Sequence, residues 1–394
     1  MNILHTADWH LGNIFHGHDR TAEHRHFLDW LLGVLRERKP DALIVAGDVF
    51  DSPNPSAAAE RLFYDFLEAA TEAVDGLQVV VTAGNHDSAG RLEAPAALLE
   101  RHHIYIRGVV RRTEKDEPDL ARHIIPLGRR ESDEATCVCF ALPYLRSSDY
   151  PAGLSAEEGL RHFFDGLWRT LKKSDYRGLP VVVAAHFYAA GADICESEHS
   201  ERLVVGGQDA VAADVTGRAV YVALGHIHGP QNVDGERVRY CGTPLKYSFS
   251  EARHQKSVTV AELGEKGELL VRTVPLRPMR DMREIRGTYM ELAARSFYQG
   301  LSREDYYHIT LTDEEDVRDA VGKLRVIYKN LMKLDYDNLR TRGAGQIRGA
   351  ERVERKTPLE LFEEFYEKQN NQGMSAGQRE LVQTMIEKIW GDDR

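Results

Sequence analysis

Residues 42–51 read ALIVAGDVFD, an apolar run that ends in a glycine and then in acidic side chains. The run Ala42–Ala46 has the length of a short buried strand. Gly47 permits a sharp turn after that strand, and Asp48 and Asp51 follow at its carboxyl end. In layered α/β folds, ligands bind at the carboxyl ends of the strands. The stretch therefore predicts one strand of a layered α/β domain that presents carboxylates to a ligand.

Four further predicted strands end in the same way. The strand Ile3–Ala7 is followed by Asp8 and His10, and the strand Leu77–Thr82 is followed by Asn85, His86 and Asp87. The strand Pro180–Ala185 is followed by His186, and the strand Ala219–Leu224 is followed by His226 and His228. Imidazole and carboxylate ligands together suit Mn²⁺, Fe²⁺ or Zn²⁺. Two such ions, about 3.5–4 Å apart and bridged by a carboxylate such as Asp48, can activate a water and neutralise the charge of a phosphoryl displacement. One such piece alone is a weak signal, but the ordered set predicts a two-metal site.

The rest of the chain to about residue 270 alternates short apolar runs with helical patterns, among them Phe27–Leu35 and Ala59–Leu67. A further strand is expected at Ala135–Leu142. This alternation predicts an α/β layered domain, which we place at residues 1–274.

A small α+β domain is expected at residues 275–340. Its predicted elements are a strand within Arg280–Arg286, strands at His308–Leu311 and Leu331–Leu334, and a helix from about Glu314 to Tyr328.

Residues 341–394 are expected to form a linker followed by two amphipathic helices. The first helix follows Thr357-Pro358 and the second follows Ser375. The second carries a wide apolar stripe, which must be buried against something. Folding back onto the chain's own core stays possible, but a tethered pair of this kind favours docking to the helices of a partner.

Composition limits the class of protein. The 394 residues carry a net charge of −11, which argues against a generally basic nucleic-acid-binding surface. No apolar run approaches the roughly 20 residues that span a bilayer, and the N-terminus does not resemble a secretory signal. Four cysteines do not make a disulfide framework, so reduced thiols in a cytoplasm are expected. Among the seventeen histidines, His5 is expected in the core, and the group from His16 to His26 on exposed or phosphate-facing loops rather than at a third metal.

The ordered metal-ligand set resembles the calcineurin-like metallophosphoesterase superfamily. The longer stretches HTADWHLG (residues 5–12), GDVFD (47–51) and GNHDS (84–88) are similar to its bacterial SbcD branch, and the likeness covers nearly the whole chain. The resemblance implies a four-layer α-β-β-α sandwich with a small α+β capping domain and C-terminal helices.

The resemblance also implies roles for the site residues. One metal would be held by Asp8, His10, Asp48 and His228, and the other by Asp48, Asn85, His186 and His226. His86 would contact the scissile phosphate and help the leaving oxygen depart. Asp51 would orient His86 through a hydrogen bond, although some relatives have a histidine in place of this aspartate. Two divalent ions, Mn²⁺ in this family, would be the cofactors.

For activity, the resemblance implies a DNA nuclease with double-strand exonuclease and single-strand endonuclease action. Its partners would be DNA, a coiled-coil ATPase of the SbcC type bound through the C-terminal helices, and a second copy of the chain. The helices near Ala59–Leu67 and Ala94–Leu99 are candidates for that homodimer interface, and core packing is the alternative.

Two other functions stay open on the sequence. A phosphatase or cyclic-nucleotide phosphodiesterase would use the same metals, although it has little need for the second domain or the C-terminal helices. A non-catalytic scaffold that holds the ATPase on DNA is the other alternative, against which the intact ligand set argues.

Overall fold

The computed structural model describes residues 1–132, 134–193, 210–264, 268–339, 341, 359, 362–363, 366 and 374–390. The chain divides into two compact units, Met1–Asp281 and Met282–Arg394. Domain boundaries at residues 274 and 340 stay predictions.

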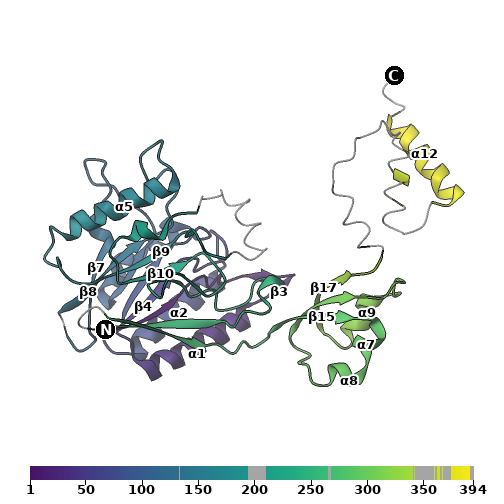
Figure 1. Cartoon of the computed structure of the whole chain (residues 1–394), viewed down its shortest axis with the longest axis horizontal. Helices are drawn as coiled ribbons and strands as arrows, with labels where there is room; N and C mark the ends of the chain where they lie inside the picture. The colour runs from purple at the N-terminus through teal and green to yellow at the C-terminus, as the bar shows by residue number, and fades with distance from the viewer. Residues whose placement is uncertain are drawn as a thin grey trace. The chain divides into compact units, whose positions relative to one another are not determined.

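Two six-stranded mixed sheets form the centre of the first unit (Figure 1). The first sheet contains, in spatial order, β14 (Leu269–Pro275), β13 (Ser257–Leu263), β1 (Asn2–Thr6), β4 (Ala42–Ala46), β5 (Gln78–Thr82) and β6 (Ile104–Arg107). The second contains β11 (Gln231–Asp234), β12 (Val238–Tyr240), β10 (Tyr221–Gly225), β9 (Val181–His186), β8 (Ala135–Leu142) and β7 (Ile124–Gly128). β1, β4, β5 and β6 run parallel, as do β8, β9, β10 and β12, so their carboxyl ends lie at one edge of each sheet.

Helices cover the outer face of each sheet. The longer helices of this unit are α1 (Thr21–Arg38), α2 (Ala57–Ala73) and α5 (Ala156–Leu171). Shorter elements complete it: β2 (Ile14–Phe15), β3 (His18–Asp19), α3 (Ala89–Glu93), α4 (Ala96–Leu99), and the 3₁₀ turns η1 (Glu100–His102), η2 (Leu120–His123), η3 (Ala213–Thr216) and η4 (Phe249–Glu251). Buried residues of α1 and α2 pack on β1, β4 and β5, and those of α5 pack on β8, β9 and β10. The expected α-β-β-α layering is therefore confirmed.

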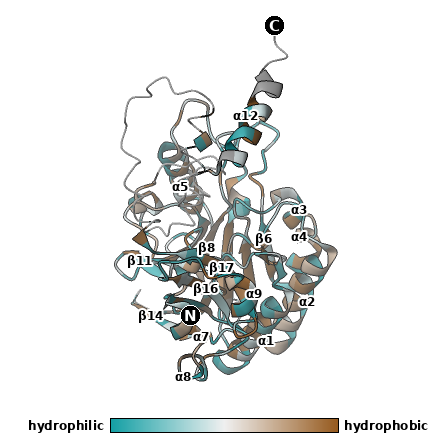
Figure 2. Cartoon of the chain, turned by 90° about the vertical axis from the view of Figure 1, so that its right-hand side faces the viewer, coloured by the Kyte–Doolittle hydropathy of each residue, from teal (hydrophilic) through white to brown (hydrophobic). Residues whose placement is uncertain are grey.

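The inner faces of the two sheets form a third apolar cluster that includes Ile44, Val80, Val182 and Ala223. Strands buried on both faces consist almost entirely of apolar residues, which explains why ALIVA was a readable strand signal. Figure 2 shows hydrophobic residues along the central strands, whereas α1 and α2 carry both hydrophilic and hydrophobic residues. His5 lies in this interior, fully buried, and its Nδ1 is 2.8 Å from the hydroxyl of Tyr221, as expected of a hydrogen-bonded core histidine.

Cysteine and histidine expectations had mixed outcomes. Cys137, Cys139 and Cys241 are free and buried, as expected, while Cys195 lies outside the described residues. His24 and His26 lie on α1 rather than on a loop, and of the two only His26 is exposed, as expected. His24 is buried there, with its Nε2 3.0 Å from the hydroxyl of Tyr247.

The second unit contains a three-stranded parallel sheet with short helices between its strands. Its elements are β15 (Met282–Gly287), α7 (Tyr289–Ala293), α8 (Arg295–Tyr298), β16 (Tyr306–Leu311), α9 (Ala320–Arg325) and β17 (Asn330–Tyr336). The predicted helix from Glu314 to Tyr328 was wrong in extent, because α9 begins only at Ala320. Asp319 ends the preceding turn with a φ of 52°, and its side chain accepts a hydrogen bond from the amide of Gly322. Such a cap fixes where a helix starts.

The second of the two predicted C-terminal helices is α12 (Ala376–Trp390), and Ser375 caps its start by accepting from the amide of Gln378. Most of the predicted linker and of the first C-terminal helix lies outside the described residues. In the described parts of the chain, no helix combines the length and the apolar character needed to cross a membrane.

Candidate metal centre

The site lies at the carboxyl ends of β1, β4, β5, β9 and β10, where the five predicted motifs meet. The loop after β1 is joined to the loop after β4 by backbone hydrogen bonds, from the amide of Asp8 to the carbonyl of Gly47 (3.0 Å) and from the amide of His10 to the carbonyl of Asp48 (3.0 Å). Paired backbone therefore fixes the separation of the first two motifs before any side chain is considered.

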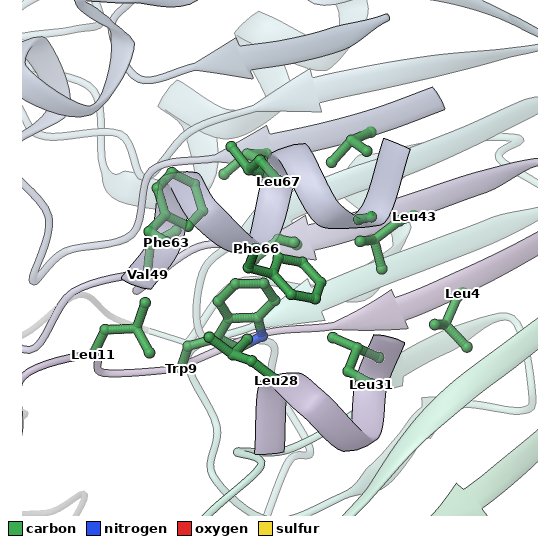
Figure 3. Packing of buried hydrophobic residues seen from close by; sticks show 14 of the residues in the cluster. Leu4, Trp9, Leu11, Leu28, Leu31, Leu43, Val49, Phe63, Phe66 and Leu67 are labelled. Atoms are coloured by element: carbon green, nitrogen blue, oxygen red, sulfur yellow. The ribbon is translucent and has the colours of Figure 1, made fainter. Parts of the chain in front are cut away.

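Trp9 anchors the segment between Asp8 and His10. Its indole is fully buried, donates to Thr6 Oγ1 (2.9 Å), and makes edge contacts with Phe27, Phe63 and Phe66. Figure 3 shows this ring lying among side chains of α1 and α2. Because the tryptophan faces the helices, the neighbouring ligand side chains face the opposite way, toward the site.

Asp48 is the common member of two groups of metal-ligating side chains. One comprises Asp8, Asp48 and His186, the other His10, Asp48 and His86, and within each the ligand atoms lie within 4.8 Å of one another. The Nε2 of His186 is 3.3 Å from Asp48 Oδ2 and its Nδ1 is 3.8 Å from Asp8 Oδ1. Asp48 is therefore the carboxylate that belongs to both groups.

The remaining predicted ligands join this cluster through direct contacts. Asn85 Oδ1 is 3.0 Å from His186 Nε2 and 3.0 Å from His226 Nδ1. The amide of His226 donates to Asp8 Oδ1 (2.9 Å). The ring of His228 lies 5.3 Å from the ring of His10, centre to centre. All the residues predicted as ligands are therefore brought together.

Several polar atoms here are buried without a hydrogen-bond partner among the described residues: Asp8 Oδ2 and both ring nitrogens of His10. Buried polar atoms are normally satisfied, so orphaned ones need an explanation. Oxygen and imidazole nitrogen are the donors that divalent first-row metals accept. The residues present therefore fit a divalent metal centre.

Electrostatics of the metal-free site support the same conclusion. Burial raises the pKa of Asp8 to about 7, and the nearby Asp48 adds to that rise. Burial lowers the pKa of His186, but the carboxylate of Asp48 outweighs this and raises it to about 9. Packing charged groups this closely in a dry site is costly. Bound cations would relieve the repulsion between the carboxylates.

Three glycines at the ends of the strands make room for the ligands. A Cβ on Gly47 would lie 2.2 Å from His186 Nδ1, one on Gly84 2.0 Å from Asp48 Oδ1, and one on Gly225 1.9 Å from the carbonyl oxygen of Ala46. Real Cβ atoms do not approach so closely, so no larger residue fits without displacing a ligand or its supporting strand.

The ligand backbone itself has an unusual conformation. Asp8, His10, Asp48 and His226 have positive φ angles of 53°, 47°, 49° and 101°. Aspartate and histidine are among the residues that adopt this left-handed region more often than most.

His86 is oriented by backbone groups. Its amide donates to Asp48 Oδ1 (2.8 Å), and its Nδ1 is 3.0 Å from the carbonyl oxygen of Asp51. The sequence-based expectation was that Asp51 orients His86 through a hydrogen bond, without specifying the atom. The carboxylate instead accepts from Asn13 (2.9 Å) and lies 3.6 Å from His10 Nδ1. Asp51 therefore orients His86 through its main chain.

Asp87 supports the site in a way that the sequence did not reveal. Its buried carboxylate accepts from the amides of Val49 (3.2 Å), Phe50 (2.9 Å) and Gly84 (2.9 Å). It therefore ties the loop after β4 to the loop after β5. Its position directly after His86 in a motif was the only available signal.

A second support comes from residues 243–256, which sequence reasoning did not single out. Glu251 Oε1 is 3.3 Å from His228 Nδ1, and Lys256 Nζ is 2.5 Å from Glu251 Oε2. Burial alone would raise the pKa of Glu251, but the Lys256 ammonium lowers it below its usual range. Tyr247 packs its ring 5.1 Å from that of His10 and donates its hydroxyl proton to the carbonyl of Trp9.

Comparison with known proteins agrees with this geometry. Residues 1–230 match the calcineurin-like phosphoesterase family, and residues 278–370 match the type 5 capsule protein repressor C-terminal domain. The SbcD subunit of the nuclease SbcCD from Rhodobacter capsulatus is 43% identical over 72% of this chain and 71% of that protein. The SbcD subunits of Bacillus subtilis (32%, 99% of this chain and 98% of that protein) and Escherichia coli K12 (31%, 84% and 83%) are also similar. The chain therefore belongs to the calcineurin-like phosphoesterases and, within them, to the family of the SbcD subunit of the nuclease SbcCD.

Proposed function

We propose that this chain is a Mn²⁺-dependent DNA nuclease, with double-strand exonuclease and single-strand endonuclease activity, that works with a coiled-coil ATPase of the SbcC type. The observation that carries the proposal is the convergence of five strand-end motifs on Asp48, which is 3.3 Å from His186 and belongs to two groups of possible metal ligands. The relatives are SbcD subunits of the nuclease SbcCD, which supports a nuclease activity for this chain.

The proposed ligands form two sets that share Asp48. The first metal would be held by Asp8, His10, Asp48 and His228, and the second by Asp48, Asn85, His186 and His226. Bound at these positions, two divalent ions would supply a nucleophilic water at neutral pH and positive charge for the phosphoryl group in the transition state. The mixed imidazole and carboxylate set suits Mn²⁺.

His86 is proposed as the acid that assists the leaving oxygen. The carbonyl of Asp51 can only accept a hydrogen bond, so Nδ1 of His86 carries a proton. To act as the acid, the ring must therefore be doubly protonated, so that it gives the second proton from Nε2 to the leaving oxygen and becomes neutral. His86 is partly exposed, unlike the buried His186, while its Nε2 atom is itself buried. The hydrogen bond from Nδ1 to the Asp51 carbonyl orients the ring, and the bond from the His86 amide to Asp48 Oδ1 fixes its backbone, which reduces the entropy lost when substrate binds.

The net charge of −11 bears on how DNA is held. An acidic protein gains little from general attraction to phosphate, so cations in the site and contacts from a partner must supply it. Residues 275–340 are proposed as a capping domain for DNA recognition, with domain boundaries at residues 274 and 340.

The C-terminal helix supports a partner. On α12, Leu381 and Met385 are 61% and 54% exposed, so the apolar stripe is open to another protein. We propose that it docks the ATPase, and that two copies of this chain act in one cytoplasmic assembly.

A nuclease assay on the full chain tests this function. With Mn²⁺, the protein is expected to degrade linear double-stranded DNA and to nick single-stranded circles. His86→Ala should reduce the rate about 10²–10⁴-fold, the usual contribution of a positioned acid, while two Mn²⁺ ions are retained. His162→Ala on α5 is the matched control and should keep full activity. Turnover of a small phosphodiester without cleavage of DNA would contradict the proposed substrate.

A further inference from the structure

A buried ion pair lies directly behind His228. Glu251 and Lys256 are 0% and 2% exposed, and their charged atoms are 2.5 Å apart. Glu251 Oε1 faces His228 Nδ1 at 3.3 Å. The ammonium of Lys256 therefore contacts the carboxylate of Glu251, which in turn contacts the imidazole of His228, a proposed ligand of the first metal.

The pair also holds the backbone of His228. Lys256 Nζ donates to the carbonyl of His228 (2.9 Å) and to Thr243 Oγ1 (2.6 Å), and the amide of Thr243 donates to the same carbonyl (3.2 Å). The ring and the backbone carbonyl of His228 are thus both held by one segment, residues 243–256. The ring therefore has little freedom to turn away from the site.

The contact with Glu251 also settles which ring nitrogen faces the metal. An ionised carboxylate only accepts hydrogen bonds, so the Nδ1 of His228 carries the proton. That leaves the lone pair on Nε2 for a metal. A carboxylate behind a ligating imidazole fixes the ring's orientation and raises the basicity of the other nitrogen.

Stability alone does not account for such a pair. Removing two charges from water costs more than their attraction returns unless the geometry is excellent, and apolar replacements are often neutral or stabilising. A lysine and a glutamate at these positions therefore point to a purpose beyond packing.

We propose that Glu251, held in place by Lys256, is a positioning residue for the first metal, and that it sets the affinity of this site through the tautomer and basicity of His228. The inference rests on the proposed ligand role of His228.

Calorimetric titration of the full chain with Mn²⁺ tests it. The wild-type protein is expected to bind two ions. Glu251→Gln keeps the size and an acceptor but removes the charge, and should weaken one ion about 10–100-fold while the other is unchanged. Because Lys256 is then buried without its counter-ion, the double variant E251Q/K256M is measured as well. It removes both charges together and should show the same loss of affinity in a folded protein.

The nuclease reaction supplies a second readout. In Glu251→Gln the Mn²⁺ concentration for half-maximal rate should rise about 10–100-fold, with kcat at saturating Mn²⁺ nearly unchanged. A purely structural role would instead lower kcat and the unfolding temperature of the metal-free protein.

The matched control is Glu93→Gln. Glu93 is also a buried carboxylate, but it pairs with Arg111 and Arg122 (both 2.9 Å) on another part of the same unit, so both Mn²⁺ affinities should stay as in the wild type. Two bound ions of unchanged affinity in Glu251→Gln and in the double variant would overturn the role of Glu251 alone. Absence of Mn²⁺ binding by the wild-type protein would instead refute the proposed ligand set.

Discussion

Gly84→Ala is a steric probe of the site, because it adds one methyl group at the most crowded point beside Asp48. The new Cβ would lie 2.0 Å from Asp48 Oδ1, 2.6 Å from its Cγ and 2.4 Å from its backbone nitrogen. Contacts under 3.0 Å cannot persist, and neither the strand end nor the shared carboxylate is the free end of a flexible side chain. Overpacking of this kind costs about 1–3 kcal/mol.

The effect on metal binding follows from which atom must move. Asp48 belongs to both proposed ligand sets, so its displacement should weaken both ions. If about 3 kcal/mol of strain is relieved in the metal-free form but not in the metal-bound form, the affinity for Mn²⁺ falls about 100-fold. Each step of about 1.4 kcal/mol in binding free energy corresponds to a factor of ten in affinity. Mn²⁺ titration and the nuclease assay measure these losses, and thermal unfolding without metal separates them from a loss of stability.

Gly33→Ala is the matched control for that experiment. Gly33 lies on the exposed side of α1, and a Cβ there meets nothing within 4 Å. Alanine in a helix should stabilise the fold by about 0.5–1 kcal/mol and leave metal binding unchanged. If Gly84→Ala bound two ions with wild-type affinity and cleaved DNA at the wild-type rate, the proposed bridging position of Asp48 would be wrong.

Three further outcomes are expected. Asp51→Ala keeps the carbonyl that orients His86, so at saturating Mn²⁺ the nuclease rate should fall far less than in His86→Ala, for which a loss of about 10²–10⁴-fold is expected. Equal losses in the two variants would mean that the Asp51 side chain, and not its carbonyl, orients His86. His186, with its pKa raised from 6.5 to about 9, stabilises the metal-free fold below pH 6.5 and loses that contribution as the pH rises through 9. Since a metal must displace this proton, Mn²⁺ affinity should rise by up to about tenfold per pH unit between pH 6.5 and 8, and calorimetry showing no proton release would contradict this. Phe66→Ala, which removes a ring 5.2 Å from Trp9, should cost about 3–5 kcal/mol in urea unfolding, whereas Leu98→Ala at a 70% exposed position should change stability by less than about 0.5 kcal/mol.

The parts of the fold that could be predicted are those in which the local pattern and the tertiary structure agree. The strand Ala42–Ala46 was predicted to the residue, because it is buried on both faces and ends at a glycine. The strand Ala135–Leu142 was likewise predicted to the residue. In contrast, β14 has a half-exposed, mixed sequence at the sheet edge and carries no clear signal. The helix expected from Glu314 was misplaced because an apolar periodicity does not reveal a cap.

The site divides in a similar way. The proposed ligands could be found because each follows a recognisable strand. Glu251 and Lys256 could not, since they lie in a stretch with one short 3₁₀ turn and their relation to His228 depends on the tertiary fold. The hydrogen bond expected between Asp51 and His86 involves the Asp51 carbonyl, which could not be predicted because a sequence does not show the direction of a carbonyl.

The left-handed backbone at Asp8, His10, Asp48 and His226 has a consequence for how the protein acquires its metals. Such conformations cost of order 1–3 kcal/mol each and persist only where the surroundings impose them. Here the sheets, the glycines and the buried tryptophan impose them, so the arrangement of the proposed ligands is preorganised by folding itself. Loading should therefore require little rearrangement of the main chain, and a chelated enzyme should recover quickly when metal is restored.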